Sequence, residues 1–132
     1  MRKGSLLRRE DGQAMTELAL VLPVFAVLLL AIVQFGVAFN NYLTLTDATR
    51  AGARKAAVSR FVGDSGAGAV AAVKSAAQGL SSPPLTVSVT STNWAVPGSD
   101  VTVTATYPYS ISILGFVVKS GTLSSTTQER LE

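Results

Sequence analysis

The chain has 132 residues, of which 48% are hydrophobic and only 14% are charged, whereas an average soluble domain carries about 25% charge. This balance favours a membrane segment, and the lack of Cys and His excludes a disulfide framework, a thiolate metal site and histidine chemistry. The net charge of +3 does not indicate nucleic-acid binding, because four of the eleven basic residues lie within the first twelve positions.

The first predicted segment is a short basic leader, residues 1–12, which ends in Gly12. Its four basic residues oppose only two acidic ones. Basic residues beside a membrane segment hold that end on the cytoplasmic side, so the leader predicts a cytoplasmic N-terminus and an extracytoplasmic C-terminal part. Further basic residues follow the apolar segment, so the predicted orientation depends on the leader.

A long uncharged segment follows the leader. No charged residue occurs from Leu18 to Thr46, and residues 18–39 are almost wholly apolar. As a helix these 22 residues would be about 33 Å long, enough to cross a hydrocarbon core of about 30 Å. A buried core helix is a poorer explanation, because so short a chain has too little other apolar surface to surround a helix that is apolar on all sides.

Two residues interrupt this apolar segment. Pro23 removes one backbone hydrogen bond and predicts a kink, which membrane helices tolerate better than soluble ones. Gln34 either bonds a neighbouring helix or lies near the outer end of a tilted span, and we expect the second.

The helical pattern continues beyond the span, so we expect one helix over residues 13–61. Ala48, Gly52 and Ala56 recur at a spacing of four and form a face of small residues. Such a face permits close approach of another helix or of a sheet. The charged residues around Arg50 are expected to form a solvated stripe on the other side.

Residues 62–132 are predicted to form a small α+β head. A short helix is expected over residues 67–78, and alternating apolar and Ser/Thr residues predict strands at 85–90, 101–107 and 122–128. The predicted fold is therefore α+β, with a long N-terminal transmembrane helix, a second short helix and a roughly three-stranded antiparallel sheet. The apolar stretch from Ile111 to Val118 fits core, a loop on the membrane or a partner surface, and core is the default expectation.

The most informative stretch joins the leader to the apolar segment. Gln13 follows Gly12, and a single carboxylate, Glu17, lies directly before the apolar run. Gly12 has no side chain and can lie extended in a protease cleft. Glu17 is favoured near a helix N-terminus, so taken alone it also fits an ordinary carboxylate at the membrane interface.

In combination these residues resemble the type IV prepilin superfamily, and in particular the TadE-like pseudopilins of the tight-adherence (type IVc) pilus system. The resemblance is carried by GQAMTELALVLP at 12–23, by Phe35-Gly36 and by residues 48–54. It implies a pilin-like fold and cleavage by a prepilin peptidase between Gly12 and Gln13. It also implies that Glu17 and Pro23 serve subunit assembly, Glu17 by neutralising the N-terminal amine of a neighbouring subunit.

Two departures bear on the type of pilin. Gln13 stands where many prepilins have Phe, and Leu18 stands where the short major pilins of this class usually have an aromatic residue. The chain is also much longer than those major pilins. The resemblance therefore implies a minor pilin or pseudopilin rather than the bulk subunit.

We also expect a structural protein, not an enzyme, because the chain has no His or Cys, its Asp residues are isolated in sequence, and no phosphate loop or metal-ligand spacing occurs. No cofactor, small-molecule substrate or nucleic-acid partner is expected. Its expected partners are the prepilin peptidase, other pilins, the pilus assembly platform and membrane lipid. Its expected location is the cytoplasmic (inner) membrane, as a single pass with the N-terminus inside and the head outside, and an extracellular pilus after assembly. The alternative is a single-pass membrane-anchored extracytoplasmic adhesin or sensor that is not incorporated in a filament.

Overall fold

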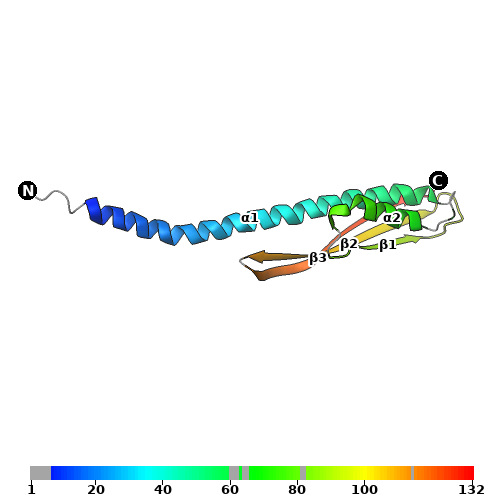
Figure 1. Ribbon diagram of the computed structural model, residues 1–132. Coiled ribbons are helices and arrows are strands. Elements are labelled where there is room, and N and C mark those ends of the chain that lie inside the picture. The colour runs from blue at the N-terminus through cyan, green and yellow to red at the C-terminus, as the bar shows by residue number, and fades with distance from the viewer. Residues whose placement is uncertain (1–6, 60–62, 64–65, 81–82, 114) are drawn as a thin grey trace, which may run out of the picture.

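The computed structural model describes residues 7–59, 63, 66–80, 83–113 and 115–132, with side chains from Gly12 onward. Its elements are two helices, a short 3-10 helix and three strands: α1 (Leu7–Ala57), α2 (Ala67–Ala76), η2 (Gln78–Leu80), β1 (Thr86–Ser91), β2 (Asp100–Ile113) and β3 (Phe116–Arg130). In Figure 1, α1 runs the length of the molecule, and α2 and the sheet lie along its C-terminal half. This arrangement confirms the predicted α+β fold.

Some expected features lie outside the described residues. They are the first six residues of the basic leader and positions 60–62, where the long helix was expected to end. Within the described chain, α1 begins at Leu7 and ends at Ala57. Gly12 therefore lies inside the helix.

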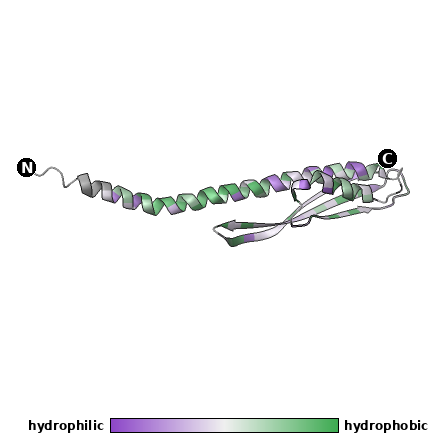
Figure 2. Ribbon diagram, in the orientation of Figure 1, coloured by the Kyte–Doolittle hydropathy of each residue, from purple (hydrophilic) through white to green (hydrophobic). Residues whose placement is uncertain are grey.

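From Gly12 to Leu30, every residue of α1 is exposed in the described part of the chain. The most apolar eighteen residues of the helix include no buried residue, and large side chains such as Leu20, Phe25 and Ile32 are more than half exposed. Figure 2 shows this segment as a nearly continuous hydrophobic stretch. The helix is long and apolar enough to cross a membrane, and it fits a single-pass membrane anchor.

The C-terminal half of α1 packs against the head through its face of small residues. Ala48 and Ala56 are fully covered, and Gly52 is buried between them. A Cβ on Gly52 would overlap the Val73 side chain of α2 and lie 3.2 Å from the Ala69 carbonyl oxygen and 3.5 Å from Cγ1 of Val103 in β2. Gly52 thus lets the helix approach both α2 and the sheet, as the spacing of small residues predicted.

The core of the head lies between α1, α2 and one face of the sheet. The alternating pattern of β2 directs four side chains inward, where they are at most 6% exposed: Val101, Val103, Ala105 and Tyr107. Val73 and Leu80 close the core from α2 and η2. The intervening Thr residues of β2 are only partly covered, so the period of two correctly predicted one wet face and one packed face.

The sheet has the order β1-β2-β3 and is antiparallel throughout. β1 pairs with β2 only from Thr106 to Val101, whereas β2 and β3 continue as a hairpin to the pair Ile113–Phe116, with a register shift at Ile111/Ser112. Gly115, with φ of 86°, supplies the left-handed conformation of the turn. Both hairpin strands are therefore longer than the sequence predicted.

The expectation that residues 111–118 belong to the core is wrong. They form the end of the β2–β3 hairpin, where Ile111 and Ile113 are half-buried and Phe116, Val117 and Val118 are exposed. The sequence misleads here because an apolar run with a glycine fits a buried strand as well as an exposed hairpin. The hairpin projects beyond β1 along α1 (Figure 1).

We expect Gly52→Val to destabilise the head by about 1–3 kcal/mol, because the added side chain has to displace Val73 and the backbone of α2. Trp94 packs against the core, so thermal unfolding of the full chain in detergent can be followed by its fluorescence. Gly36→Val is the matched control on the same helix, since a Cβ there meets nothing within 4 Å. Equal melting of the two variants would mean that the α1–α2 contact does not limit stability.

Candidate assembly and membrane site

The residues of the predicted cleavage and assembly motif lie on one exposed stretch of α1. Glu17 accepts a hydrogen bond of 3.1 Å at Oε1 from Nε2 of Gln13, one helical turn earlier. The Thr16 hydroxyl donates to the Gly12 carbonyl oxygen at 2.8 Å. The structure thus brings Gln13 and Glu17 together, a pairing that sequence reasoning did not anticipate although their spacing of four permits it.

Gly12 lies inside α1, so the predicted cleavage after Gly12 would require a local change in the helix. A peptide bound in an extended form cannot keep the helical hydrogen bonds on either side of Gly12, so the first turns of α1 must open. A glycine at position 12 makes this opening easier, because glycine in a helix is about 1 kcal/mol less favourable than Ala. Only proline is less favourable in a helix than glycine. Among the described residues, no atom outside the helix lies within 4 Å of a Cβ built on Gly12, so the described head does not cover this position.

Pro23 lies in the uncovered half of α1, six residues after Glu17. Its ring nitrogen cannot donate to the carbonyl one turn earlier, so the helix is weakened at this point. In Figure 1 the blue part of α1 changes direction, as a proline in a helix predicts.

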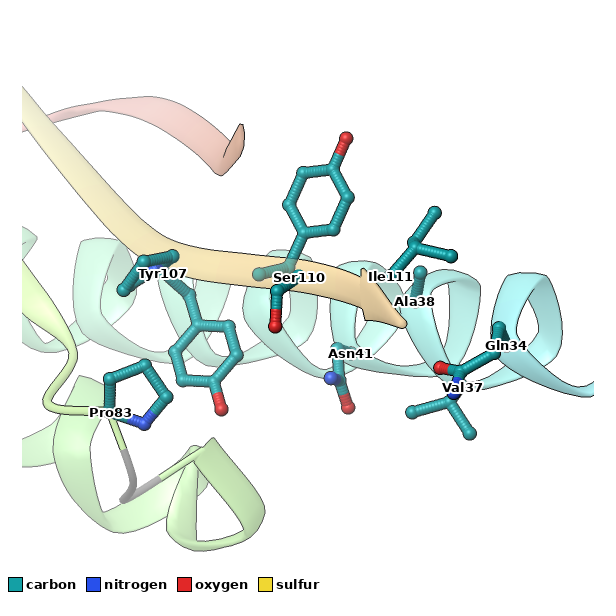
Figure 3. Close-up of a pocket in the computed structure, with 10 residues that line it drawn as sticks. Gln34, Val37, Ala38, Asn41, Pro83, Tyr107, Ser110 and Ile111 are labelled. Carbon is teal, nitrogen blue, oxygen red and sulfur yellow. The ribbon is translucent and has the colours of Figure 1, made fainter. Parts of the chain in front are cut away.

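Gln34 makes the polar link between the apolar half of α1 and the head. Its Nε2 donates to the Ser112 carbonyl oxygen in β2 at 2.9 Å. Figure 3 places Gln34 beside the end of β2, next to Ile111. The sequence interpretation offered a neighbouring helix or the membrane boundary and missed this contact, because a bond across 78 residues leaves no local signal.

Two shallow grooves flank the contact between α1 and β2. One has a volume of about 360 Å³ and is lined by polar and apolar residues, among them Gln34, Asn41 and Tyr109 (Figure 3). The other, of about 250 Å³, is almost wholly apolar and is lined by Phe35, Phe39 and Tyr42 of α1 together with side chains of the hairpin. Phe35 and Phe39 stack with ring centroids 6.4 Å apart.

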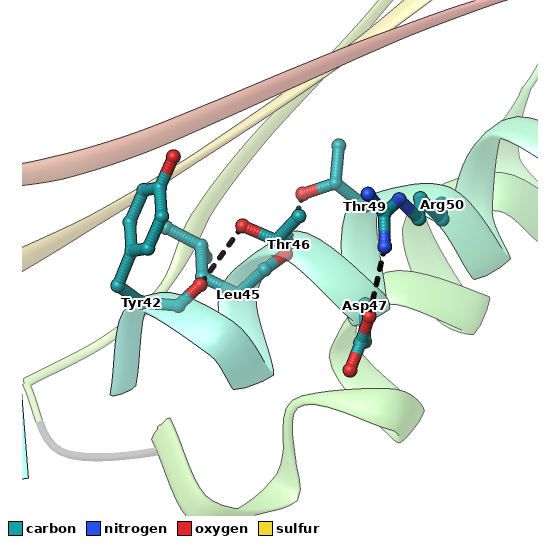
Figure 4. Close-up of polar contacts among 6 residues, drawn as sticks. All are labelled: Tyr42, Leu45, Thr46, Asp47, Thr49 and Arg50. Atoms are coloured by element: carbon teal, nitrogen blue, oxygen red, sulfur yellow. Dashed lines mark hydrogen bonds and ion pairs between the residues drawn. The ribbon is translucent and has the colours of Figure 1, made fainter. Parts of the chain in front are cut away.

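The charged stripe beyond the span is solvated, as expected. Arg50 pairs with Asp47 at 3.3 Å, but their side chains are 60% and 77% exposed, so the pair contributes little to stability. On the same stretch the Thr46 and Thr49 hydroxyls donate to carbonyl oxygens one turn earlier, as Figure 4 shows. These contacts are local to α1. Within the described part of the chain, no three His, Cys, Asp or Glu side chains gather as metal ligands.

The described chain thus combines a long apolar helix, exposed from Gly12 to Leu30, with a small α+β head packed against the C-terminal half of that helix, and it contains one helix that is long and apolar enough to cross a membrane. The family model described as TadE-like protein matches residues 12–54, which confirms the resemblance predicted from the sequence. The match covers nearly all of α1 from Gly12 onward, and the head lies outside it. No curated protein and no solved structure matched the chain.

The match makes residues 12–54 similar to TadE-like proteins, the family that the sequence resemblance indicated. The TadE-like family is structural rather than enzymatic.

Proposed function

We propose that this protein is a minor pilin, or pseudopilin, of a type IVc pilus assembly, processed by a prepilin peptidase after Gly12. The observation that carries the proposal is the TadE-like match, which starts at Gly12 and includes Glu17, on a helix whose N-terminal half is free of the head. The peptidase, other pilins and the assembly platform are its proposed partners.

The uncovered half of α1 supports this proposal on energetic grounds. Each large apolar side chain left in water costs about 1.5–3 kcal/mol relative to burial. Lipid covers this surface while the protein is in the membrane, and packed helices of other subunits can cover it in a filament. The apolar surface of α1 is therefore shielded from water both in the membrane and in the filament.

Glu17 gives this movement a specific electrostatic step. Cleavage after Gly12 creates an ammonium group at Gln13 and leaves Glu17 one turn into the helix. An ion buried among apolar helices costs several kcal/mol unless it is paired. The carboxylate of one subunit and the ammonium of the next satisfy each other once they are packed together. In the single chain, the Gln13 side-chain amide donates a hydrogen bond of 3.1 Å to the Glu17 carboxylate. This bond satisfies the carboxylate before the ammonium group of a neighbouring subunit binds it.

The proposed location is the cytoplasmic membrane, with the N-terminus inside and the head outside. The basic leader supports this orientation. In the alternative function, an anchored adhesin or sensor, the chain has the same orientation but keeps its leader and does not enter a filament. The state of the N-terminus therefore distinguishes the two functions.

Coexpression with the cognate peptidase should yield a chain that starts at Gln13. Gly12→Leu should abolish this cleavage, because a bulky side chain obstructs an extended backbone in the cleft. Intact-mass analysis of membrane-extracted protein measures the outcome, and Gly36→Leu, which also faces open space, is the control that should still be cut. A wild-type chain that keeps Met1 in the presence of the peptidase would favour the anchored alternative.

The orientation gives a second test. Protease added to spheroplasts should digest the head, because the head faces outward. Immunoblotting with an antibody against the head measures this, and a cytoplasmic protein should stay intact in the same sample. A head that is digested only after lysis would reverse the proposed topology.

Glu17→Gln tests the charge pairing, since it keeps the size of the side chain and removes its charge. We expect normal membrane insertion and cleavage but a loss of assembly, because an unpaired ammonium among apolar helices costs several kcal/mol. Assembly is scored by copurification with the other pilus subunits. Asp47→Asn is the matched control, because Asp47 is an exposed carboxylate on the same helix that pairs with Arg50 of its own chain. Normal assembly of the processed Glu17→Gln protein would contradict the mechanism.

A further inference from the structure

The end of the β2–β3 hairpin is an apolar surface that the pilin function does not explain. We call Ile113 together with residues 115–118 the hairpin tip. Phe116, Val117 and Val118 are 78%, 65% and 64% exposed, although each is a residue type that is usually buried. In the described chain these three consecutive side chains are the only large apolar ones of the head, apart from Val96, that are nearly half exposed or more.

The course of β2 places the tip beside the apolar half of α1. Val103 of β2 lies at Gly52, and Ser112 lies at Gln34. The strand therefore runs antiparallel to the helix, from its C-terminal end back toward the membrane span. Figure 1 shows the hairpin continuing in this direction past the end of β1. The tip thus reaches at least the level of Gln34, which lies within the apolar run of α1.

This position corresponds to a shallow depth in the membrane. Gln34 precedes Phe39, the last residue of the apolar run, by five positions, or about 7.5 Å along a helix. Apolar faces that bind a membrane surface insert about 5–10 Å, to the boundary between headgroups and acyl chains. When α1 spans the bilayer, the tip lies at this boundary.

The polar groups of the hairpin also fit this depth. Lipid tails cannot hydrogen-bond to a strand edge, so an open edge is excluded from the middle of a bilayer. β1 does not pair with β2 beyond Thr106, so the end of β2 has no strand neighbour on that side. On this part of β2, the Ser112 carbonyl oxygen accepts a hydrogen bond from the Gln34 side chain instead. Lys119 follows the three apolar residues directly and is exposed, so its ammonium can reach the phosphates of the headgroups. Tyr42 and Tyr109 beside the apolar groove suit the same boundary.

We propose that the hairpin tip inserts into the leaflet that faces the head, so that phospholipid acyl chains cover Phe116, Val117 and Val118. Lipid is the occupant that the geometry favours, because the tip is continuous with the uncovered surface of α1, which already requires lipid. The head is then attached to the membrane at two points, the helix and the tip. This inference rests on the membrane span of α1 and does not depend on cleavage or on filament assembly.

The absence of Cys allows a direct test in the full chain. Phe116→Cys and Val117→Cys each accept an environment-sensitive fluorophore, and the labelled proteins are reconstituted in phosphatidylcholine vesicles at a high lipid-to-protein ratio. Ser124→Cys is the matched control, because it lies exposed on the same strand about 27 Å from Phe116. Trp94 fluorescence verifies that each head is folded.

Labels at positions 116 and 117 should show blue-shifted emission and loss of intensity with nitroxide lipids. A nitroxide near the headgroup end of the acyl chain should quench more than one near the methyl end. The label at position 124 should remain red-shifted and unquenched. Red-shifted, unquenched labels at the tip would overturn the proposal. So would blue-shifted labels that lipid nitroxides do not quench and that respond to protein density, since that result assigns the tip to a second copy of the chain.

Discussion

The structure depends on one constraint, which is that a long part of α1 exposes apolar side chains that the described head leaves uncovered. Large residues such as Leu20 and Phe35 are 73% and 69% exposed in the single chain. Since transfer of such surface out of water dominates protein energetics, the molecule is complete only in lipid or among other apolar helices. The head is correspondingly small and packs against the other half of α1, where Ala48, Gly52 and Ala56 leave room for α2 and β2.

The division of α1 follows from the size of its side chains. The small residues Ala48, Gly52 and Ala56 and the buried Leu45 face the head, whereas the large side chains before Ala31 are exposed on all sides of the helix. Gly52 marks the closest approach, with Val73 on one flank and Val103 on the other. The hairpin extends this contact toward the membrane segment, and Gln34 fixes its far end by a single bond to Ser112. A short sequence of 132 residues thereby builds a rod with a head that cannot rotate freely about it.

Local sequence patterns predicted most of this fold. Periods of 3.6 and 2 located α1, α2 and the three strands, and the spacing of Ala48, Gly52 and Ala56 predicted the packed face. The length of the β2–β3 hairpin was not predictable, because residues 111–118 suit a buried strand and an exposed hairpin equally. The Gln34–Ser112 bond joins distant segments and has no signature in either one. The roles proposed for Gly12 and Glu17 lie in contacts with other proteins, so a single chain gives the position of these residues and not their partners.

Pro23 gives the rod an uneven stiffness. From Gln34 onward α1 is braced by β2 and then by α2, whereas the segment before it is a single helix with a missing hydrogen bond at Pro23. A force applied along the chain is therefore not shared equally. The part of α1 that packs against the head transmits the force without bending, whereas the single helix before Gln34 bends or unwinds first, at Pro23. If the subunit is drawn out of the membrane, it should bend or stretch below the head, and the head should follow as an intact unit.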